Sequence, residues 1–310
     1  NGGTWDNTSG NVAIAMAGSL RNDGTFGAGT GVYTISGAAK TIGGVSTISI
    51  PNLTVNGTIT NNGTLNVGTA LSGSGTVTNG AGATLGIGGT SGVTTLTATA
   101  NPNTVDYIGA AQTVRAITYH HLSLSGSGAK TLTNVATING NLTLSGTCTA
   151  ATAVALTVGG NLSVGTGTAF TAAGFNLTVT GTTSVSGTLA HSSATGTRTY
   201  NGLITIAPGG SWTNSGNSAI TFQGGLIHDG AAFSSGTGVY TFATNSQAVG
   251  GGSALTIGNV TVTGVTLTNN SPNFTVSTAL SGTGDLVQGA GATLYVGGTS
   301  GITTLDASAD

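Results

Sequence analysis

Apolar and hydroxyl residues alternate in short stretches that recur along the whole chain. The clearest are tetrads of the form Asn-apolar-Thr/Ser-apolar, with a histidine variant at His121-Leu122-Ser123-Leu124: Asn52-Leu53-Thr54-Val55, Asn141-Leu142-Thr143-Leu144, Asn161-Leu162-Ser163-Val164, Asn176-Leu177-Thr178-Val179, Asn259-Val260-Thr261-Val262 and Asn273-Phe274-Thr275-Val276. A period of two marks a strand with one buried and one exposed face. Pairs such as Asn56-Gly57 and Gly159-Gly160 flank these stretches and supply the positive φ angles that tight turns need. The pattern predicts short strands separated by turns, and it predicts no helix.

A longer repeat is superimposed on the short one. The segment Asn79–Ala100 is identical to Gln288–Ala309 at 16 of 22 aligned positions. Other matches, upstream of these segments, have offsets close to 207. We therefore expect residues 1–207 to be the first long unit and residues 208–310 to be the first half of a second copy, within one continuous rod.

Two all-β architectures fit such a pattern, a string of β-sandwich domains or a parallel β-solenoid. The tetrad-type strands that begin at residues 121, 141 and 161 lie 20 residues apart, which is a solenoid coil length. Stacked coils favour threonine and asparagine ladders and disfavour like charges, which would lie about 4.8 Å apart. The sequence predicts an all-β parallel β-solenoid (β-helix) of about 15 coils, expected to be right-handed.

The composition argues against nucleic-acid binding and against a membrane span. The 310 residues include 56 glycines but only 5 Lys+Arg and 7 Asp+Glu, for a net charge of −2. Five cations cannot form the basic stripe of a nucleic-acid-binding protein, so no nucleic-acid partner is expected. No run of about 18 apolar residues occurs, so no membrane span is expected either.

The amino-acid sequence of the repeats resembles that of giant secreted bacterial β-solenoid repeat proteins, such as filamentous-haemagglutinin-like adhesins and autotransporter-passenger-like surface fibres. The residues that carry the resemblance are the Asn-Leu-Thr-Val tetrads, the step Asn62-Gly63-Thr64-Leu65, and Gly43-Gly44 with its copy Gly250-Gly251. The resemblance covers essentially the whole chain. It implies an extracellular or cell-surface location and a role as a surface fibre, an adhesin or a matrix component.

Acidic residues are few and scattered. All seven are aspartates: Asp6, Asp23, Asp106, Asp229, Asp285, Asp306 and Asp310. General acid–base cleavage of a polysaccharide needs two carboxylates, or an equivalent pair, near one bond. Asp23 and Asp229 occupy the same repeat position beside a glycine, where an aspartate normally accepts hydrogen bonds from local backbone N–H groups. We expect no catalytic residues and no enzyme activity.

Histidines and aromatic residues offer little more chemistry. His120 and His121 would point to opposite faces of a strand, and His191 and His228 are read as solvent-facing or turn residues. We expect no metal-binding and no cofactor-binding residues, and no cofactor. The repeat-equivalent pair Trp5 and Trp212 fits core filling better than a sugar-stacking platform. Cys148, Tyr33/Tyr240 and Phe26/Phe233 are expected in the core. Thr-x-Thr pairs that could match ice or a carbohydrate lattice occur no more often than chance predicts.

The favoured function is a structural protein, a rod segment or subunit of an extracellular or cell-surface fibre. Its expected partners are other copies of itself, stacked end to end, or other surface-fibre components. The alternative is an adhesin that binds glycans or surfaces through a lateral face, and a polysaccharide-active enzyme ranks below both. Neither the first nor the last hundred residues are rich in the lysines and prolines that protect strand edges, which favours either stacking or membership of a longer rod.

Overall fold

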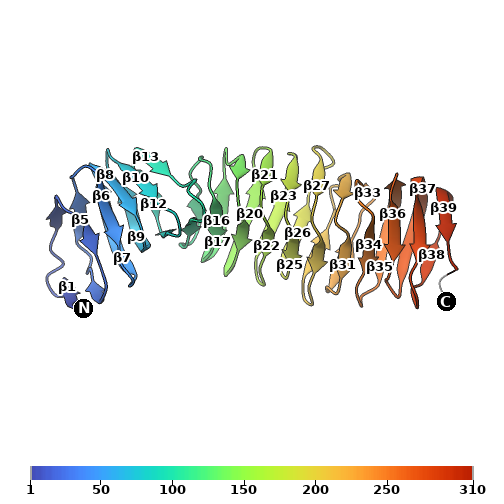
Figure 1. Ribbon diagram of the computed structural model, residues 1–310, viewed down its shortest axis with the longest axis horizontal. Helices are drawn as coiled ribbons and strands as arrows, with labels where there is room; N and C mark the ends of the chain where they lie inside the picture. Colours follow the sequence, from blue (N-terminus) through green and yellow to red (C-terminus); the bar gives the residue numbers. More distant parts are fainter. Residues whose placement is uncertain (1, 309–310) are drawn as a thin grey trace. The chain divides into compact units, whose positions relative to one another are not determined.

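The structure, a computed structural model, describes residues 2–308 and is an all-β parallel solenoid of about 15 turns. No residue within this range is helical, so none belongs to a helix that could cross a membrane. The chain divides into two compact units, Asn1–Leu142 and Thr143–Asp310. In each unit the strands of one coil pair in parallel with those of the next, which confirms the solenoid and excludes the sandwich (Figure 1). The division at 207/208 and the hand of the coil stay predictions.

The first unit contains these strands: β1 (Thr4–Asp6), β2 (Ile14–Met16), β3 (Leu20–Arg21), β4 (Thr25–Gly27), β5 (Val32–Ile35), β6 (Lys40–Gly43), β7 (Ile48–Val55), β8 (Thr58–Asn61), β9 (Thr64–Ser72), β10 (Thr76–Asn79), β11 (Thr84–Ile87), β12 (Thr90–Ser91), β13 (Thr95–Thr97), β14 (Thr104–Tyr107), β15 (Gln112–Thr113), β16 (His121–Leu124), β17 (Ser127–Leu132) and β18 (Thr137–Ile138). Strand β19 (Leu142–Leu144) begins at the last residue of this unit.

The second unit continues with these strands: β20 (Thr147–Thr152), β21 (Leu156–Val158), β22 (Leu162–Val164), β23 (Ala169–Ala172), β24 (Leu177–Val179), β25 (Thr183–Val185), β26 (Thr188–His191), β27 (Arg198–Tyr200), β28 (Ile204–Ile206), β29 (Ser211–Thr213), β30 (Ile220–Phe222), β31 (Leu226–His228), β32 (Ala232–Ser234), β33 (Val239–Ala243), β34 (Gln247–Gly250), β35 (Leu255–Thr263), β36 (Thr266–Asn269), β37 (Phe274–Gln288), β38 (Leu294–Val296) and β39 (Thr299–Asp306).

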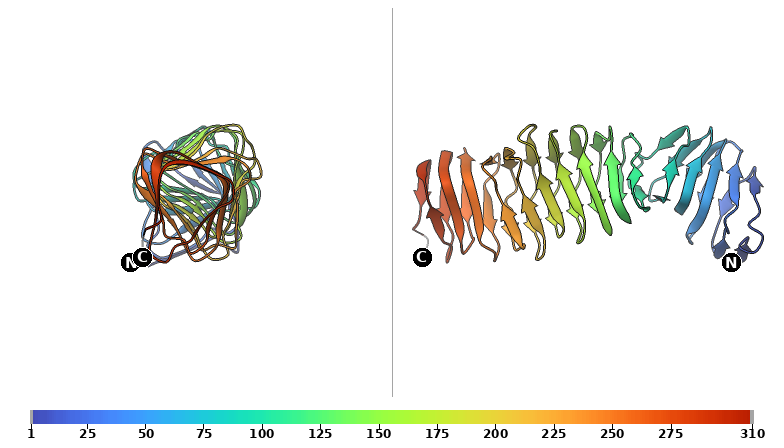
Figure 2. Two further views of the ribbon diagram at one scale, coloured as in Figure 1. Left: turned by 90° about the vertical axis from the view of Figure 1, so that its right-hand side faces the viewer. Right: turned by 180° about the vertical axis from the view of Figure 1, so that it is seen from behind.

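The period-two pattern decides which side chains form the core. In β24, Leu177 and Val179 are fully buried while Thr178 between them faces outward. The register places Leu177 beside Leu156 of the preceding coil and Thr178 beside Thr157. Like residues therefore stack on like, and apolar columns fill the interior of each unit. The end-on view in Figure 2 shows the flat sides and corners of the C-terminal coil.

Asparagines form buried ladders at coil corners. The Nδ2 group of Asn61 donates to Oδ1 of Asn79 in the next coil, over 2.8 Å, and Asn79 in turn donates to the carbonyl of Thr104, over 2.9 Å. In the second unit Asn269 donates to Oε1 of Gln288, over 2.7 Å. Each side-chain amide donates a hydrogen bond to an acceptor in the next coil, so these polar groups can be buried without losing their hydrogen bonds.

One proline lies inside a strand. Pro51 belongs to β7, at the point where the register with β9 shifts between Ile50 and Asn52. The repeat-equivalent residue Gly258 lies at the matching shift in β35, between Ile257 and Asn259. A bulge needs no ladder hydrogen bond from its extra residue, so proline and glycine are both tolerated there.

Candidate functional site: a lateral hollow present in both sequence copies

The two repeat-equivalent aspartates connect neighbouring coils. Oδ1 of Asp23 accepts the N–H of Val45 over 3.1 Å, and Oδ1 of Asp229 accepts the N–H of Gly252 over 2.6 Å. The expected local turn bond was therefore wrong, since each acceptor serves the corner of the following coil. Asp23 also accepts from Arg21 Nε over 2.6 Å, and this hydrogen bond lowers the pKa of Asp23.

Three of the four remaining described acids, all except Asp285, have separate partners. Asp6 accepts from the N–H and hydroxyl of Thr8, which lowers the pKa of the carboxyl, and Asp306 is held in the same way by Ser308. Asp106 accepts from the hydroxyl of Ser125 over 2.8 Å. Asp310 lies outside the described residues. Between residues 2 and 308, no three His, Cys, Asp or Glu side chains gather into a group that could hold a metal ion.

All four histidines differ from the sequence prediction. His120 and His121 do not point apart, because His120 lies in a bend before β16, and their rings meet edge to face at 4.3 Å. Nδ1 of His121 accepts the N–H of Asn141 over 2.9 Å. His191 is fully buried, and not solvent-facing as expected, with Nε2 2.7 Å from the hydroxyl of Tyr200. Burial lowers the pKa of His191 to about 3.

His228 is the last residue of β31, immediately before a turn, and it is buried. Its Nδ1 accepts the N–H of Gly230 over 3.3 Å, and burial lowers the pKa of the imidazole. Asn22 has the same role in the first copy, since its Oδ1 accepts the N–H of Gly24 over 3.1 Å. The repeat position therefore requires a turn acceptor, which either side chain supplies.

Three of the five cationic side chains donate hydrogen bonds to main-chain carbonyls of the coils. Lys130 is buried and its Nζ donates to the carbonyls of Gly109 and Ala110 and to Oε1 of Gln112, each over 2.7 Å. Arg115 reaches the carbonyls of Val93 and Thr94, and the buried Arg198 reaches those of Ala173 and Thr195. Few positive charges are left to attract an anionic ligand.

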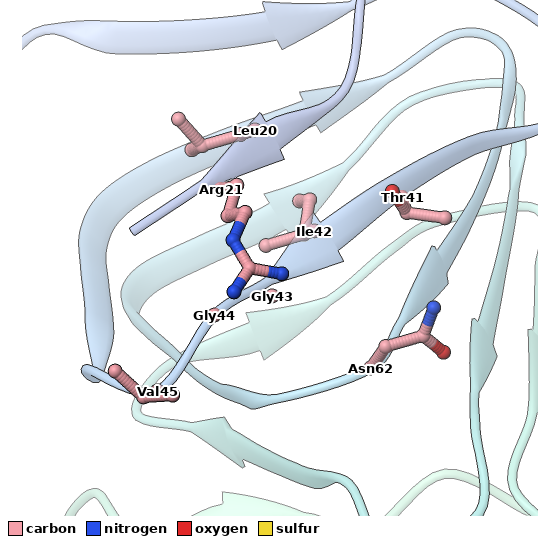
Figure 3. Close-up of a pocket in the computed structure, with 8 residues that line it drawn as sticks. All are labelled: Leu20, Arg21, Thr41, Ile42, Gly43, Gly44, Val45 and Asn62. Atoms are coloured by element: carbon pink, nitrogen blue, oxygen red, sulfur yellow. The ribbon is translucent and has the colours of Figure 1, made fainter. Parts of the chain in front are cut away.

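One surface feature of the first unit is a hollow, which we call the lateral hollow. It has a volume of about 290 Å³ and is lined by residues of β3, of β6 and the turn after it, and by the residue that follows β8: Leu20, Arg21, Thr41, Ile42, Gly43, Gly44, Val45 and Asn62 (Figure 3). Gly43 forms the floor because it pairs with Arg21 on one side and lies against Asn62 on the other. An outward-facing position without a side chain leaves the space open.

The same hollow recurs in the second unit, with a volume of about 310 Å³. Leu226, Val249, Gly250, Gly251 and Asn270 line it and match the first set by repeat position. One lining residue differs in kind: Ile227 pairs with Gly250 in the second copy, whereas Arg21 pairs with Gly43 in the first. An atom added as Cβ at Gly250 would meet nothing closer than 3.7 Å. Packing therefore does not require glycine on the floor of the second hollow.

A second surface feature was missed because it crosses coils instead of following one strand. Outward-facing hydroxyl residues align through consecutive registers in the second unit, and they form this column: Thr157, Thr178, Thr199, Thr221, Thr241, Thr261 and Ser281. The hydroxyls of Thr261 and Ser281 lie 3.1 Å apart, within hydrogen-bond distance. Counting Thr-x-Thr pairs along the sequence cannot reveal such a column, whereas the coil spacing could.

The core prediction is confirmed for four residues, and it is wrong for Trp5. Trp212, Tyr33, Tyr240 and Cys148 are fully buried. Phe26 and Phe233 are half-buried, and Trp5 is 45% exposed.

Comparison with known proteins adds no identification. No family model matches the chain, and neither a curated protein nor a solved structure is similar to it at a significant level.

Proposed function

We propose that the protein is a structural element of an extracellular or cell-surface fibre, in which solenoid coils stack from one copy to the next or continue within a longer chain. The observation that carries the proposal is the state of the coil edges. At one edge β1, β2 and β3 pair on one side only within the described residues, and Trp5 is 45% exposed there. At the other edge Tyr295 of β38 is 55% and Leu305 of β39 is 45% exposed.

Such edges favour association. Unpaired strand N–H and C=O groups act as a template for another strand unless charge, proline or a covering segment blocks them. The described edge strands contain no lysine and no proline. A net charge of −2 on 310 residues also gives little repulsion between copies.

The proposal includes no enzymatic role. Five of the six described aspartates accept hydrogen bonds in turns or from neighbouring coils, and Lys130, Arg115 and Arg198 donate to main-chain carbonyls, so most of the ionisable groups already have structural partners. A hydrolytic site would need two carboxylates about 5 to 10 Å apart around one bond.

Sedimentation velocity over a range of protein concentrations tests the fibre role. We expect the wild-type chain to form species that grow with concentration, and we expect the variant Trp5→Lys/Leu305→Lys to weaken association at least about tenfold, because like charges would meet at the joined edges. Val239→Lys adds the same charge at a position that is 42% exposed in β33, away from either edge, and should associate normally. A wild-type chain that stays monomeric at every concentration would contradict the stacking of separate copies.

A second candidate function, an adhesin that binds glycans through a lateral face, is supported by the repeated lateral hollow. The lining residues Leu20 and Val45, which is 83% exposed, could contact the apolar face of a sugar ring, and the Asn62 amide could donate to hydroxyls. The variant Gly250→Val fills the second hollow without a steric conflict at Cβ. A glycan array tests this role: hits that weaken in the variant would support it, and an array without hits would remove it.

A further inference from the structure

Three Thr-x-Thr pairs stand side by side on one face of the first unit. The six residues, which we call the threonine grid, are Thr58 and Thr60 of β8, Thr76 and Thr78 of β10, and Thr95 and Thr97 of β13. The registers of these parallel strands place threonine opposite threonine in both rows, through three successive coils. Figure 1 shows the three strands as neighbours in the first unit.

The grid faces away from the core. Between the two threonines of each pair lies a buried apolar residue, which is Ile59, Val77 or Leu96. The threonines therefore point outward, and each presents a methyl group and a hydroxyl group. The hydroxyl of Thr58 accepts the N–H of Ala39 over 2.7 Å, whereas the other five hydroxyls make no hydrogen bond to another residue between residues 2 and 308.

The second copy of the repeat shows that the fold does not require these threonines. The equivalent positions there, in the same order, are Thr266, Thr268, Asp285, Val287, Thr304 and Asp306. They pair in the same registers from one coil to the next. Since the strands form with aspartate or valine at three of the six positions, strand pairing alone does not explain the uniform threonines of the first copy.

The grid is regular in two directions. Neighbouring strands lie about 4.8 Å apart, and two residues along a strand span about 6.6 Å. The row that contains Thr60 and Thr97 also extends beyond the grid, because Thr41 pairs with Thr60 in the preceding coil. Beyond Thr97, isolated parallel bridges continue the register by two more coils and place Thr118 and Thr137 next in line.

A partner that uses such a surface must itself repeat at matching distances. None of the residues in β8, β10 and β13 is charged, so the face suits an uncharged partner. The oxygen atoms of crystalline water repeat over distances of the same size as the grid spacings, and a threonine hydroxyl can donate to or accept from each of them. Individually weak contacts of this kind add up when all of them form at once.

We infer that the threonine grid binds the surface of ice crystals. A crystalline polysaccharide also has a repeating surface, but its sugar rings would be contacted best by planar aromatic side chains, and the three strands contain none. The inference goes beyond the proposed fibre role and does not rest on it, because a single chain presents the whole grid.

Ice-affinity partitioning of the full 310-residue chain tests the inference. A dilute solution is partly frozen onto a cooled surface, and the ratio of protein in the ice to protein in the liquid is compared with that of an unrelated globular protein. We expect enrichment of the wild-type chain in the ice. The variant Thr76→Asp/Thr78→Val should lower the ratio at least about fivefold, because an aspartate at the ice surface would have to give up its hydration shell.

This variant carries the residues that the second copy has at the same positions, so it should fold, and circular dichroism checks that it does. Thr237→Asp is the matched control. It adds the same charge in an exposed turn of the second unit, outside the grid, and should partition into ice as the wild-type chain does.

The second copy allows a test in the opposite direction. Asp285→Thr/Val287→Thr/Asp306→Thr supplies threonine at all six equivalent positions. It should raise the partition ratio at least about twofold above that of the wild-type chain, because the chain then carries two grids.

Two results would overturn the inference: a wild-type chain that is excluded from ice like the unrelated protein, or a Thr76→Asp/Thr78→Val variant that partitions like the wild-type chain. Binding to microcrystalline cellulose without enrichment in ice would also overturn it, in favour of a polysaccharide partner. Sedimentation distinguishes these outcomes from those for the fibre role. A monomeric chain that is enriched in ice supports the grid without the stacking of separate copies, and assemblies that are excluded from ice support the fibre role alone.

Discussion

The pair Trp5 and Trp212 offers a comparison in which the same side chain, with the same neighbours in its own copy, is covered in one place and open in the other. We predict that Trp212→Ala destabilises the protein much more than Trp5→Ala does. Trp212 is fully buried, and removal of a buried tryptophan costs about 3–5 kcal/mol. Its loss would also leave the Tyr240 hydroxyl without the donor that lies 3.1 Å away.

Substitution of Trp5 should remove less stabilising contact than substitution of Trp212. Its side chain is 45% exposed, so roughly half of the burial contribution is already absent, and we expect Trp5→Ala to cost about 1–2 kcal/mol. Because a solenoid coil contacts only its neighbours, a change at an edge coil should also loosen only that coil. A difference of about 2–3 kcal/mol corresponds to roughly a 30- to 150-fold change in the unfolding equilibrium constant.

Urea unfolding followed by far-UV circular dichroism measures the main effect, and hydrogen exchange shows where each variant loosens. Trp212→Ala should lower the urea midpoint and increase exchange in the strands around β29. Trp5→Ala should increase exchange in β1 and β4 alone. Equal loss of stability in the two variants would refute the reasoning, because it would mean that the coil of β26–β28 contributes nothing to the second copy.

Three further predictions follow from single contacts. Burial lowers the pKa of His191 to about 3, so the unfolded chain binds this proton more readily than the folded chain does. The contribution of His191 to stability should be constant above about pH 6.5 and fall as the pH drops from about 6.5 to 3, by up to about 1.4 kcal/mol per pH unit. In urea unfolding measured as a function of pH, His191→Asn should reduce this slope and leave the part that comes from His228, whose pKa burial also lowers. Gly251→Ala should destabilise by about 1–3 kcal/mol, since φ is 110° and the new Cβ would lie 2.2 Å from a carbonyl oxygen, whereas Gly250→Ala should leave the thermal midpoint nearly unchanged. Lys130→Met should lower the free energy of unfolding by about 2–4 kcal/mol, measured in urea, because it leaves buried hydrogen-bond acceptors without a donor. Lys40 is partly exposed, and a similar loss of stability in Lys40→Met would contradict this explanation.

The strand pattern was predictable because the physics is local. Alternation of Leu177, Thr178 and Val179 is enough to decide which side chains face the core, and the spacing of the tetrads is enough to indicate coils. The parallel stacking followed from the scarcity of charge, since columns of identical residues cannot be charged.

Some errors came from positions where the backbone leaves the strand. His120 lies in a bend, so the rule that neighbouring side chains point to opposite faces did not apply to it. Asp23 and Asp229 bond to the corner of the next coil, and the distance between corners of successive coils cannot be read from a turn motif alone.

Other errors were avoidable. Three polar side chains lie on the buried face of their strand, two residues from an apolar core residue. The pairs are His191 and Leu189, Arg198 and Tyr200, and Lys130 and Leu132. The period of two therefore predicts burial for all three polar side chains, once their type is set aside. Their burial is tolerated because each finds hydrogen-bond partners.

The proposed role depends on strand stacking that continues from one molecule to the next. X-ray fibre diffraction from aligned, concentrated protein tests this directly. Coils stacked along the fibre should give a reflection near 4.8 Å along the fibre axis, together with filaments one solenoid wide in electron micrographs. Discrete particles that never align, or filaments whose 4.8 Å reflection lies across the axis, would contradict the account.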